Sequence, residues 1–163
     1  SEDVAYYRFE RRLTMFTPKK ILVPTDFSPS SDMALDKALD MAEQYRSRVV
    51  VLHVIDETIQ QCAVDYCLSQ DEVERIQEQS MHDSREKLEK EVNTFKGGRA
   101  VEIEYDLQWG APVETIINEQ QKTGADLIVL GSHGRKTFKE HLVGSVTDKV
   151  VRSTRAPVMV VHA

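Results

Sequence analysis

Short apolar runs alternate along the chain with longer segments in which apolar residues recur every three or four positions. The runs are rich in β-branched residues, as strands are when both faces of a parallel sheet are covered. One further strand, at residues 100–107, alternates apolar and acidic residues, which predicts a strand with one wet face at a sheet edge. Its Tyr105 and Leu107 are expected in the core. The four buried strands are predicted at residues 19–26, 48–56, 125–131 and 156–163.

The segments between these strands are predicted to be amphipathic helices. Ser28 is a good helix cap and Pro29 suits a first turn, so a helix with one apolar stripe is expected after them. Pro112 and Gly124 mark the first turn and the end of a later helix in the same way. The four helices are predicted to span about 28–45, 70–95, 110–124 and 145–152.

This alternation predicts an α/β domain with a five-stranded parallel sheet, strand order 3-2-1-4-5, and helices on both faces. Such a sheet is half of a doubly wound, Rossmann-like nucleotide-binding fold. Ligands of these folds bind beyond the carboxyl ends of the strands, where the chain direction across the sheet reverses. One domain is expected over residues 19–163. Residues 1–18 form an N-terminal extension, either a docked amphipathic arm or a weakly ordered tail.

Composition narrows the classes of function. The chain has 163 residues and a formal net charge of −6, whereas a general nucleic-acid binder normally presents a basic face. No apolar run approaches the length of a membrane span, and no secretion signal is evident, so a cytoplasmic location without membrane contact is expected. Cys62 and Cys67 lack the spacing of a redox or zinc motif and are expected to be inert thiols, with a redox pairing as the alternative.

Three of the seven glycines lie close together after the 125–131 run, at Gly131, Gly134 and Gly144. Missing Cβ atoms would let a phosphate reach main-chain N–H groups, and a helix beginning at Ser145 would add an anion-binding N-terminus. The pattern therefore predicts a two-sided phosphate clamp. The alternative is a glycine-rich turn in which Gly144 merely permits close packing. Neither the Walker loop nor the dinucleotide GxGxxG motif is present.

The glycine segment, "GSHGRKTFKEHLVGS", matches Gly-x2-Gly-x9-Gly-[Ser/Thr] and resembles the ATP-binding branch of the universal stress proteins. "ILVPTDFS" and "VLHVID" resemble other landmarks of that family, and the resemblance extends over residues 19–163. It implies an ATP-binding regulatory module that responds to nucleotide and acts in the stress response. It also implies a Mg²⁺ or Mn²⁺ ion held by the phosphates, and a homodimer joined through the last strand. The protein partner is left unidentified.

The resemblance also implies a set of binding residues. Asp26 would reach the ribose, Val54 would meet adenine through its main chain, and the glycine segment would surround the phosphates. The full set is Pro24, Thr25, Asp26, Val54, Gly131, Ser132, His133, Gly134, Arg135, Lys136, Thr137, Gly144, Ser145, Val146 and Thr147. From its position alone, Asp26 could instead be a loop carboxylate. His133 is expected to turn its ring to solvent, with catalysis as the alternative, and His53 to be a satisfied core histidine.

Two further classes of function compete with a nucleotide sensor. A slow ATPase or phosphotransferase would use the same site, but no catalytic residue is assigned because no general base is evident near the clamp. An interaction protein with a dead site would retain no nucleotide. Gly131→Val and Gly144→Val are each expected to block ATP binding without unfolding the domain.

Overall fold

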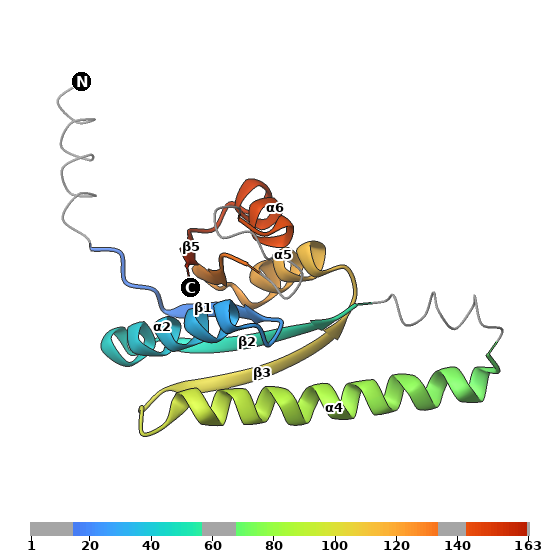
Figure 1. Ribbon diagram of the computed structural model, residues 1–163. Coiled ribbons are helices and arrows are strands. Elements are labelled where there is room, and N and C mark those ends of the chain that lie inside the picture. Colours follow the sequence, from blue (N-terminus) through green and yellow to red (C-terminus); the bar gives the residue numbers. More distant parts are fainter. Residues whose placement is uncertain (1–14, 57–67, 134–142, 163) are drawn as a thin grey trace.

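The computed structural model describes residues 15–56, 68–133 and 143–162, and Figure 1 shows how their helices and strands are arranged. Every predicted strand and helix is present within these ranges, with ends that differ by a few residues. The elements are β1 (Lys20–Thr25), α2 (Pro29–Tyr45), β2 (Arg48–Ile55), α4 (Gln70–Lys96), β3 (Glu102–Trp109), α5 (Pro112–Thr123), β4 (Leu127–Gly131), α6 (Ser145–Ser153) and β5 (Val158–Val161).

The five strands form one parallel sheet in the order β3-β2-β1-β4-β5, which confirms the predicted topology. The chain moves outward from β1 to β3 and then returns to place β4 on the other side of β1. The Asp126 carboxylate fixes the start of this central pair, because it accepts hydrogen bonds from the backbone N–H groups of Lys19, at 2.9 Å, and of Lys20, at 3.2 Å. The carboxyl ends of β1 and β4 therefore lie side by side at the point of reversal.

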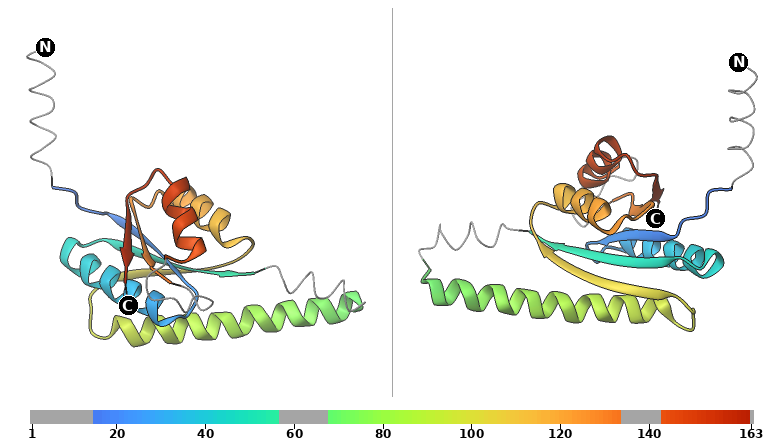
Figure 2. Two further views of the ribbon diagram at one scale, coloured as in Figure 1. Left: turned by 45° about the horizontal axis from the view of Figure 1, so that its top comes forward. Right: turned by 180° about the vertical axis from the view of Figure 1, so that it is seen from behind.

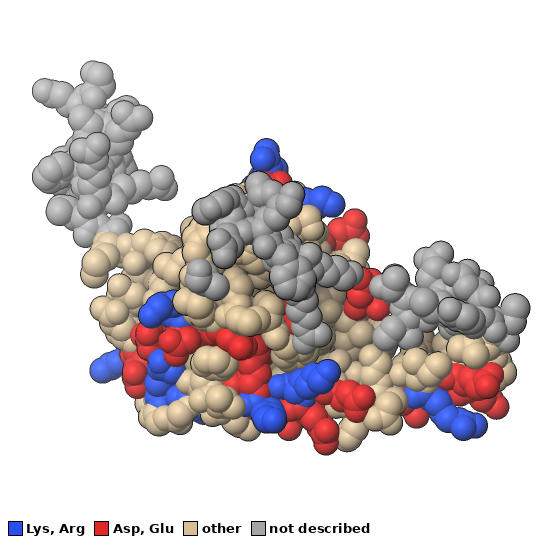
Figure 3. Space-filling view, viewed as in Figure 1, with Lys and Arg blue, Asp and Glu red and all other residues tan. Residues whose placement is uncertain are grey.

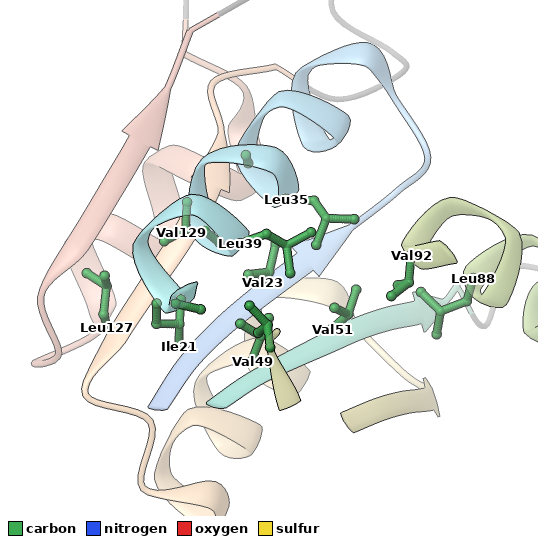
Figure 4. Close-up of a cluster of buried hydrophobic side chains, with 14 residues drawn as sticks. Ile21, Val23, Leu35, Leu39, Val49, Val51, Leu88, Val92, Leu127 and Val129 are labelled. Carbon is green, nitrogen blue, oxygen red and sulfur yellow. The ribbon is translucent and has the colours of Figure 1, made fainter. Parts of the chain in front are cut away.

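Each face of the sheet carries its own apolar core. Alternate residues of β1 point to opposite faces, so Ile21 and Val23 pack under α2 and α4 while Leu22 packs under α5 and α6. Figure 4 shows the first cluster, in which Leu35 and Leu39 of α2 cover the strands. Burying one such side chain contributes roughly 1.5–3 kcal/mol, so these contacts fix the helices against the sheet.

Helix α2 is closed at both ends by local hydrogen bonds. The Ser28 side chain accepts from the backbone N–H of Ser31, and the Ser31 side chain accepts from the backbone N–H of Ser28, which makes a capping box. At the other end, Arg46 takes a left-handed conformation with φ 57° and its N–H bonds to the Ala42 carbonyl. The first turn of α2 thus uses its own side chains to satisfy N–H groups that a ligand could otherwise reach.

The edge strand β3 departs from its prediction in one respect. Tyr105 is 46% exposed, although its alternation with acidic residues predicted a core position. Ile103 and Leu107, two residues to either side, are partly buried against the core. Among the described strands β3 pairs with β2 alone, so its side chains have a strand neighbour on one side, and the tyrosine is left exposed.

Helix α4 is longer than the sheet that it covers. Figures 1 and 2 show its N-terminal part extending past the ends of the strands. Its three buried residues, Leu88, Glu91 and Val92, all lie in the second half. Ile76, in the first half, is 40% exposed. A capping box of Ser69 and Glu72 therefore has to stabilise the start of the helix locally.

Charges of both signs are mixed on the surface. Figure 3 shows Lys and Arg side chains interspersed with Asp and Glu on one face of the molecule. Over the described part of the chain, no helix combines the length and the apolar character that crossing a bilayer requires.

Candidate functional site

The loop after β1 forms one wall of the candidate site. Thr25 is buried, and its hydroxyl oxygen accepts a hydrogen bond from the Phe27 N–H at 3.0 Å. Asp26 is half-buried and accepts from the Ser28 N–H through Oδ1 at 3.1 Å. Asp26 therefore does bond within its own loop, which was the alternative role given for it. Its contact with a ribose stays a prediction. Pro24 precedes them as a buried residue of β1.

Phe27 is the residue of this loop that sequence reasoning missed. Its φ of 61° is unusual for a non-glycine residue, and its ring lies against His53 with the ring centroids 4.3 Å apart. His53 Nδ1 lies 2.8 Å from the Thr25 carbonyl oxygen, so this nitrogen carries the proton and donates it. His53 is thus satisfied, as predicted, but it is only half-buried at the end of β2. Val54, the next residue, is paired with Gln108 of β3.

The end of β4 forms the opposite wall, together with the start of α6. The Gly144 N–H donates to the Ser132 carbonyl at 2.7 Å, and the Thr147 hydroxyl donates to the Gly131 carbonyl at 2.8 Å. The first and last glycines of the pattern are thereby brought together. The Thr147 hydroxyl hydrogen is already used in this contact.

Helix α6 begins without a capping side chain. Its N-cap residue is Gly144, and no side chain of the described residues accepts from the first turn. The N–H groups of the first helical residues have no partner within their own helix, and the helix dipole adds about half a positive charge there. Gly144 and Thr147 are buried, whereas Ser145 is exposed and Val146 half-buried. The start of α6 is therefore suited to an anion, in contrast to the self-capped start of α2.

Gly131 has a packing role that the sequence did not reveal. A Cβ atom at this position would lie 2.6 Å from the backbone carbon of Ser30 and 2.7 Å from its backbone oxygen. No side chain fits there without moving the first turn of α2. The expectation that Gly131→Val leaves the domain folded did not foresee this clash: the missing Cβ lets α2 approach β4, so a valine would have to displace the first turn of α2.

Ser132 and His133 are locked together after β4. Ser132 is fully buried, and its Oγ lies 2.7 Å from His133 Nδ1 in a hydrogen bond. The His133 N–H donates to Ser30 Oγ at 3.3 Å, which ties the segment to α2. His133 Nε2 is buried and has no hydrogen-bond partner in the structure as described. The expectation that the ring turns to solvent is thus wrong for this nitrogen.

Glu91 is the ionisable residue that sequence reasoning missed. Helix α4 carries it to the carboxyl end of β1, where the Thr25 hydroxyl donates to its Oε1 at 2.7 Å. The side chain is buried, and burial is the largest of the effects that raise the pKa of Glu91 to about 8. Its spacing from Leu88 and Phe95, three and four residues away, places it on the apolar stripe of α4, which is the signal that could have found it.

Four predicted site residues, Gly134, Arg135, Lys136 and Thr137, lie outside the described residues. Among the residues that the structure does describe, no group of three or more His, Cys, Asp or Glu side chains is placed to hold a metal ion.

Comparison with known proteins identifies the family. The sequence model of the universal stress protein family matches residues 17–162. The chain belongs to the universal stress protein family. This confirms the resemblance that the glycine pattern predicted.

Individual universal stress proteins support this membership. MJ0577 of Methanocaldococcus jannaschii is 32% identical over 153 residues, which cover 88% of this chain and 94% of that protein. The solved structure of MJ0577 matches with a TM-score of 0.78 at 30% identity, over 91% of this chain and 98% of that one. Sequence and fold therefore agree over nearly the whole length of both proteins.

Two other solved universal stress proteins of this fold contain an adenine nucleotide. One is a complex with cAMP, with a TM-score of 0.63 and 24% identity over 90% of this chain and 98% of that one. The other, from Archaeoglobus fulgidus, is a complex with dAMP, with a TM-score of 0.60 and 20% identity over 91% of this chain and 99% of that one. At these identities the likeness concerns the fold.

Proposed function

We propose that this universal stress protein binds an adenine nucleotide, with ATP as the expected ligand, beyond the carboxyl ends of β1 and β4. The observation that carries the proposal is the uncapped start of α6, held against the end of β4 by the 2.7 Å bond from the Gly144 N–H to the Ser132 carbonyl. The first N–H groups of α6, for which no described side chain is an acceptor, lie at the reversal point where doubly wound sheets bind ligands. The cAMP and dAMP complexes of proteins with this fold agree with an adenine nucleotide.

In this proposal one wall of the site contacts the ribose and adenine of the nucleotide, and the other contacts its phosphates. Asp26, whose Oδ1 accepts from the Ser28 N–H, reaches the ribose with its carboxylate. The main chain of Val54 meets the adenine. The phosphates lie between the segment that begins at Gly131 and the N–H groups of Ser145 to Thr147. A Mg²⁺ or Mn²⁺ ion is held by phosphate oxygens, which neutralise its charge and are its preferred kind of ligand.

The proposed role is regulatory: nucleotide occupancy is passed to a dimer partner or to another protein, in the cytoplasm. Strand β5 is an edge of the sheet, and among the described strands it pairs with β4 alone. Its Met159 is 38% exposed and its other residues are half-buried. Pairing with β5 of a second copy would cover this edge, which otherwise leaves backbone hydrogen-bonding groups unpaired.

Ser145→Glu tests the phosphate-binding half of the site. Residue 145 is the exposed first residue of α6, where a negative charge stabilises a helix by about 0.3–1 kcal/mol. The same charge would occupy the place of the phosphates, so ATP affinity, measured by calorimetry with Mg²⁺, is expected to fall at least about tenfold. Ser153→Glu is the matched control, because it adds the same exposed charge at the far end of the same helix.

Two results of this experiment would count against the proposal. ATP affinity that is equal in Ser145→Glu and the original chain would remove the start of α6 from the site. The absence of any ATP binding would favour an interaction protein with a dead site. Turnover of ATP, followed in the same samples, decides between a sensor and a slow ATPase.

A further inference from the structure

Glu91 lies beneath the proposed nucleotide site and belongs to neither of its walls. The packing of Leu88 and Val92 presses the second half of α4 against the sheet and brings the intervening face of the helix to the end of β1. Glu91 is only 9% exposed there. An acidic side chain is almost never buried to this extent without a partner, so its contacts require an account.

The two oxygens of Glu91 have different surroundings. Oε1 accepts from the Thr25 hydroxyl at 2.7 Å, whereas Oε2 is buried and receives no hydrogen bond from the described residues. Asp32, another carboxyl group, is close enough to Glu91 to raise the pKa of Glu91. Two ionised carboxylates only repel, and they form a hydrogen bond when one of them carries a proton.

The surroundings indicate which carboxyl carries that proton. Asp32 lies in the first turn of α2, where the helix dipole favours a negative charge, and it is half-buried. Glu91 is more deeply buried, and no basic side chain of the described residues forms an ion pair with it; the charged groups that act on it are Asp32 from α2 and Asp26 from the loop after β1. His53, at the end of β2, directs its Nδ1–H to the Thr25 carbonyl. The proton therefore belongs on Glu91.

We propose that Glu91 is a positioning residue that, as a neutral acid, fastens α4 to the first turn of α2 and to the loop that carries Asp26. Its protonated oxygen donates to the Asp32 carboxylate while its other oxygen accepts from Thr25. The Thr25 hydroxyl oxygen in turn accepts from the Phe27 N–H, so the contact reaches the loop through one intervening side chain.

Loss of this proton changes the site in two ways. The hydrogen bond to Asp32 becomes a repulsion between two carboxylates, which separates α4 from the start of α2. One negative charge is also added near Asp26, beneath a site that is proposed to hold phosphates. This second consequence depends on the proposed function, whereas the first does not. Burial and the acidic neighbours raise the pKa of Glu91 to about 8, so the change falls at mildly alkaline pH.

The test compares the original chain with Glu91→Gln and Glu89→Gln. A glutamine at 91 can donate to Asp32 and accept from Thr25 but cannot ionise. Glu89, on the exposed side of the same helix, controls for the lost charge. Side-chain carboxyl carbons are followed by NMR from pH 5 to pH 10 without nucleotide. One glutamate signal, absent from Glu91→Gln, is expected to titrate near pH 8. The backbone amides of Phe27 and Ser28 should shift at the same midpoint.

ATP affinity measured at both ends of that range completes the test. In the original chain and in Glu89→Gln it is expected to be about threefold to tenfold weaker at pH 9.5 than at pH 6.5, as one screened charge would cause. In Glu91→Gln that loss should be absent. The proposal would be overturned if the Glu91 carboxyl titrated below pH 6. It would also be overturned if the amide signals of Phe27 and Ser28 did not shift as Glu91 titrates. Failure to bind ATP at any pH would overturn the proposed function. The amide titration alone would then decide the proposal for Glu91.

Discussion

Replacement of Glu91 by glutamine should change how the stability of the fold depends on pH. Glutamine has the shape and hydrogen-bonding capacity of a protonated glutamic acid, so Glu91→Gln should resemble the original chain under acidic conditions. In the unfolded chain the pKa of Glu91 has its ordinary value of 4.5, whereas burial raises the folded value to about 8. Between these two values the folded state holds a proton that the unfolded state has released.

The sign and size of the effect follow from proton linkage. Where the folded state binds the extra proton, raising the pH stabilises the unfolded state by about 1.4 kcal/mol per pH unit. The contribution of Glu91 is therefore complete below pH 4.5, declines as the pH rises, and is lost once the pH passes about 8. Over the whole interval the loss amounts to about 5 kcal/mol, a large part of the stability of an ordinary domain.

Urea unfolding at half-unit intervals from pH 5 to pH 9 measures this loss. The quantity to plot is the unfolding free energy of Glu91→Gln minus that of the original chain. It should rise with pH by about 4 kcal/mol between pH 5 and pH 8 and then level off, whereas the same difference for Glu89→Gln should stay near zero. A flat curve for Glu91→Gln would mean that Glu91 is ionised in the folded protein, and the reasoning from its burial would fail.

Other contacts give predictions that need only one stability measurement each. Gly131→Ala should lower the unfolding free energy by about 1–3 kcal/mol because its Cβ meets the α2 backbone, whereas Gly98→Ala, with open space around it, should not. Thr25→Val should cost about 1–3 kcal/mol by leaving the Glu91 Oε1 without its donor, and Thr25→Ser should recover most of it; equal losses would point to packing instead. Ser69→Ala should cost about 1 kcal/mol through the lost α4 cap, and an unchanged unfolding free energy would show that this cap does not stabilise the fold.

The elements of the fold were predictable because their signals are local. The apolar runs of β1 and β4 and the caps of α2 are set by neighbouring residues, and the rule for parallel sheets then gives the topology. The start of α6 followed from Gly144 and Ser145 in the same way. What the sequence predicted about the site was therefore its place in the sheet and its backbone donors.

The remaining features of the site depend on contacts between distant segments. Gly131 was predicted to clear space for a ligand, but its close approach to Ser30 is set by how α2 packs on β4. Glu91 looked like one more charge on an amphipathic helix, since its partner Thr25 is 66 residues away. The exposure of Tyr105 likewise follows from which neighbours β3 lacks. No local sequence pattern predicts these contacts between distant segments.

Helices α2 and α6, which flank the end of β4, differ in how their first turns are capped. This difference has an evolutionary consequence. The Ser28 side chain caps the first turn of α2, whereas Gly144 has no side chain that could cap α6. The backbone of Gly144 is extended, with φ −61° and ψ 151°, so it suits serine or aspartate as well as glycine. A serine or aspartate at this position would accept a hydrogen bond from the first turn of α6 and so occupy N–H groups that the proposed nucleotide site needs. If that site is correct, selection for phosphate binding would keep glycine at position 144, at the cost of a side-chain cap.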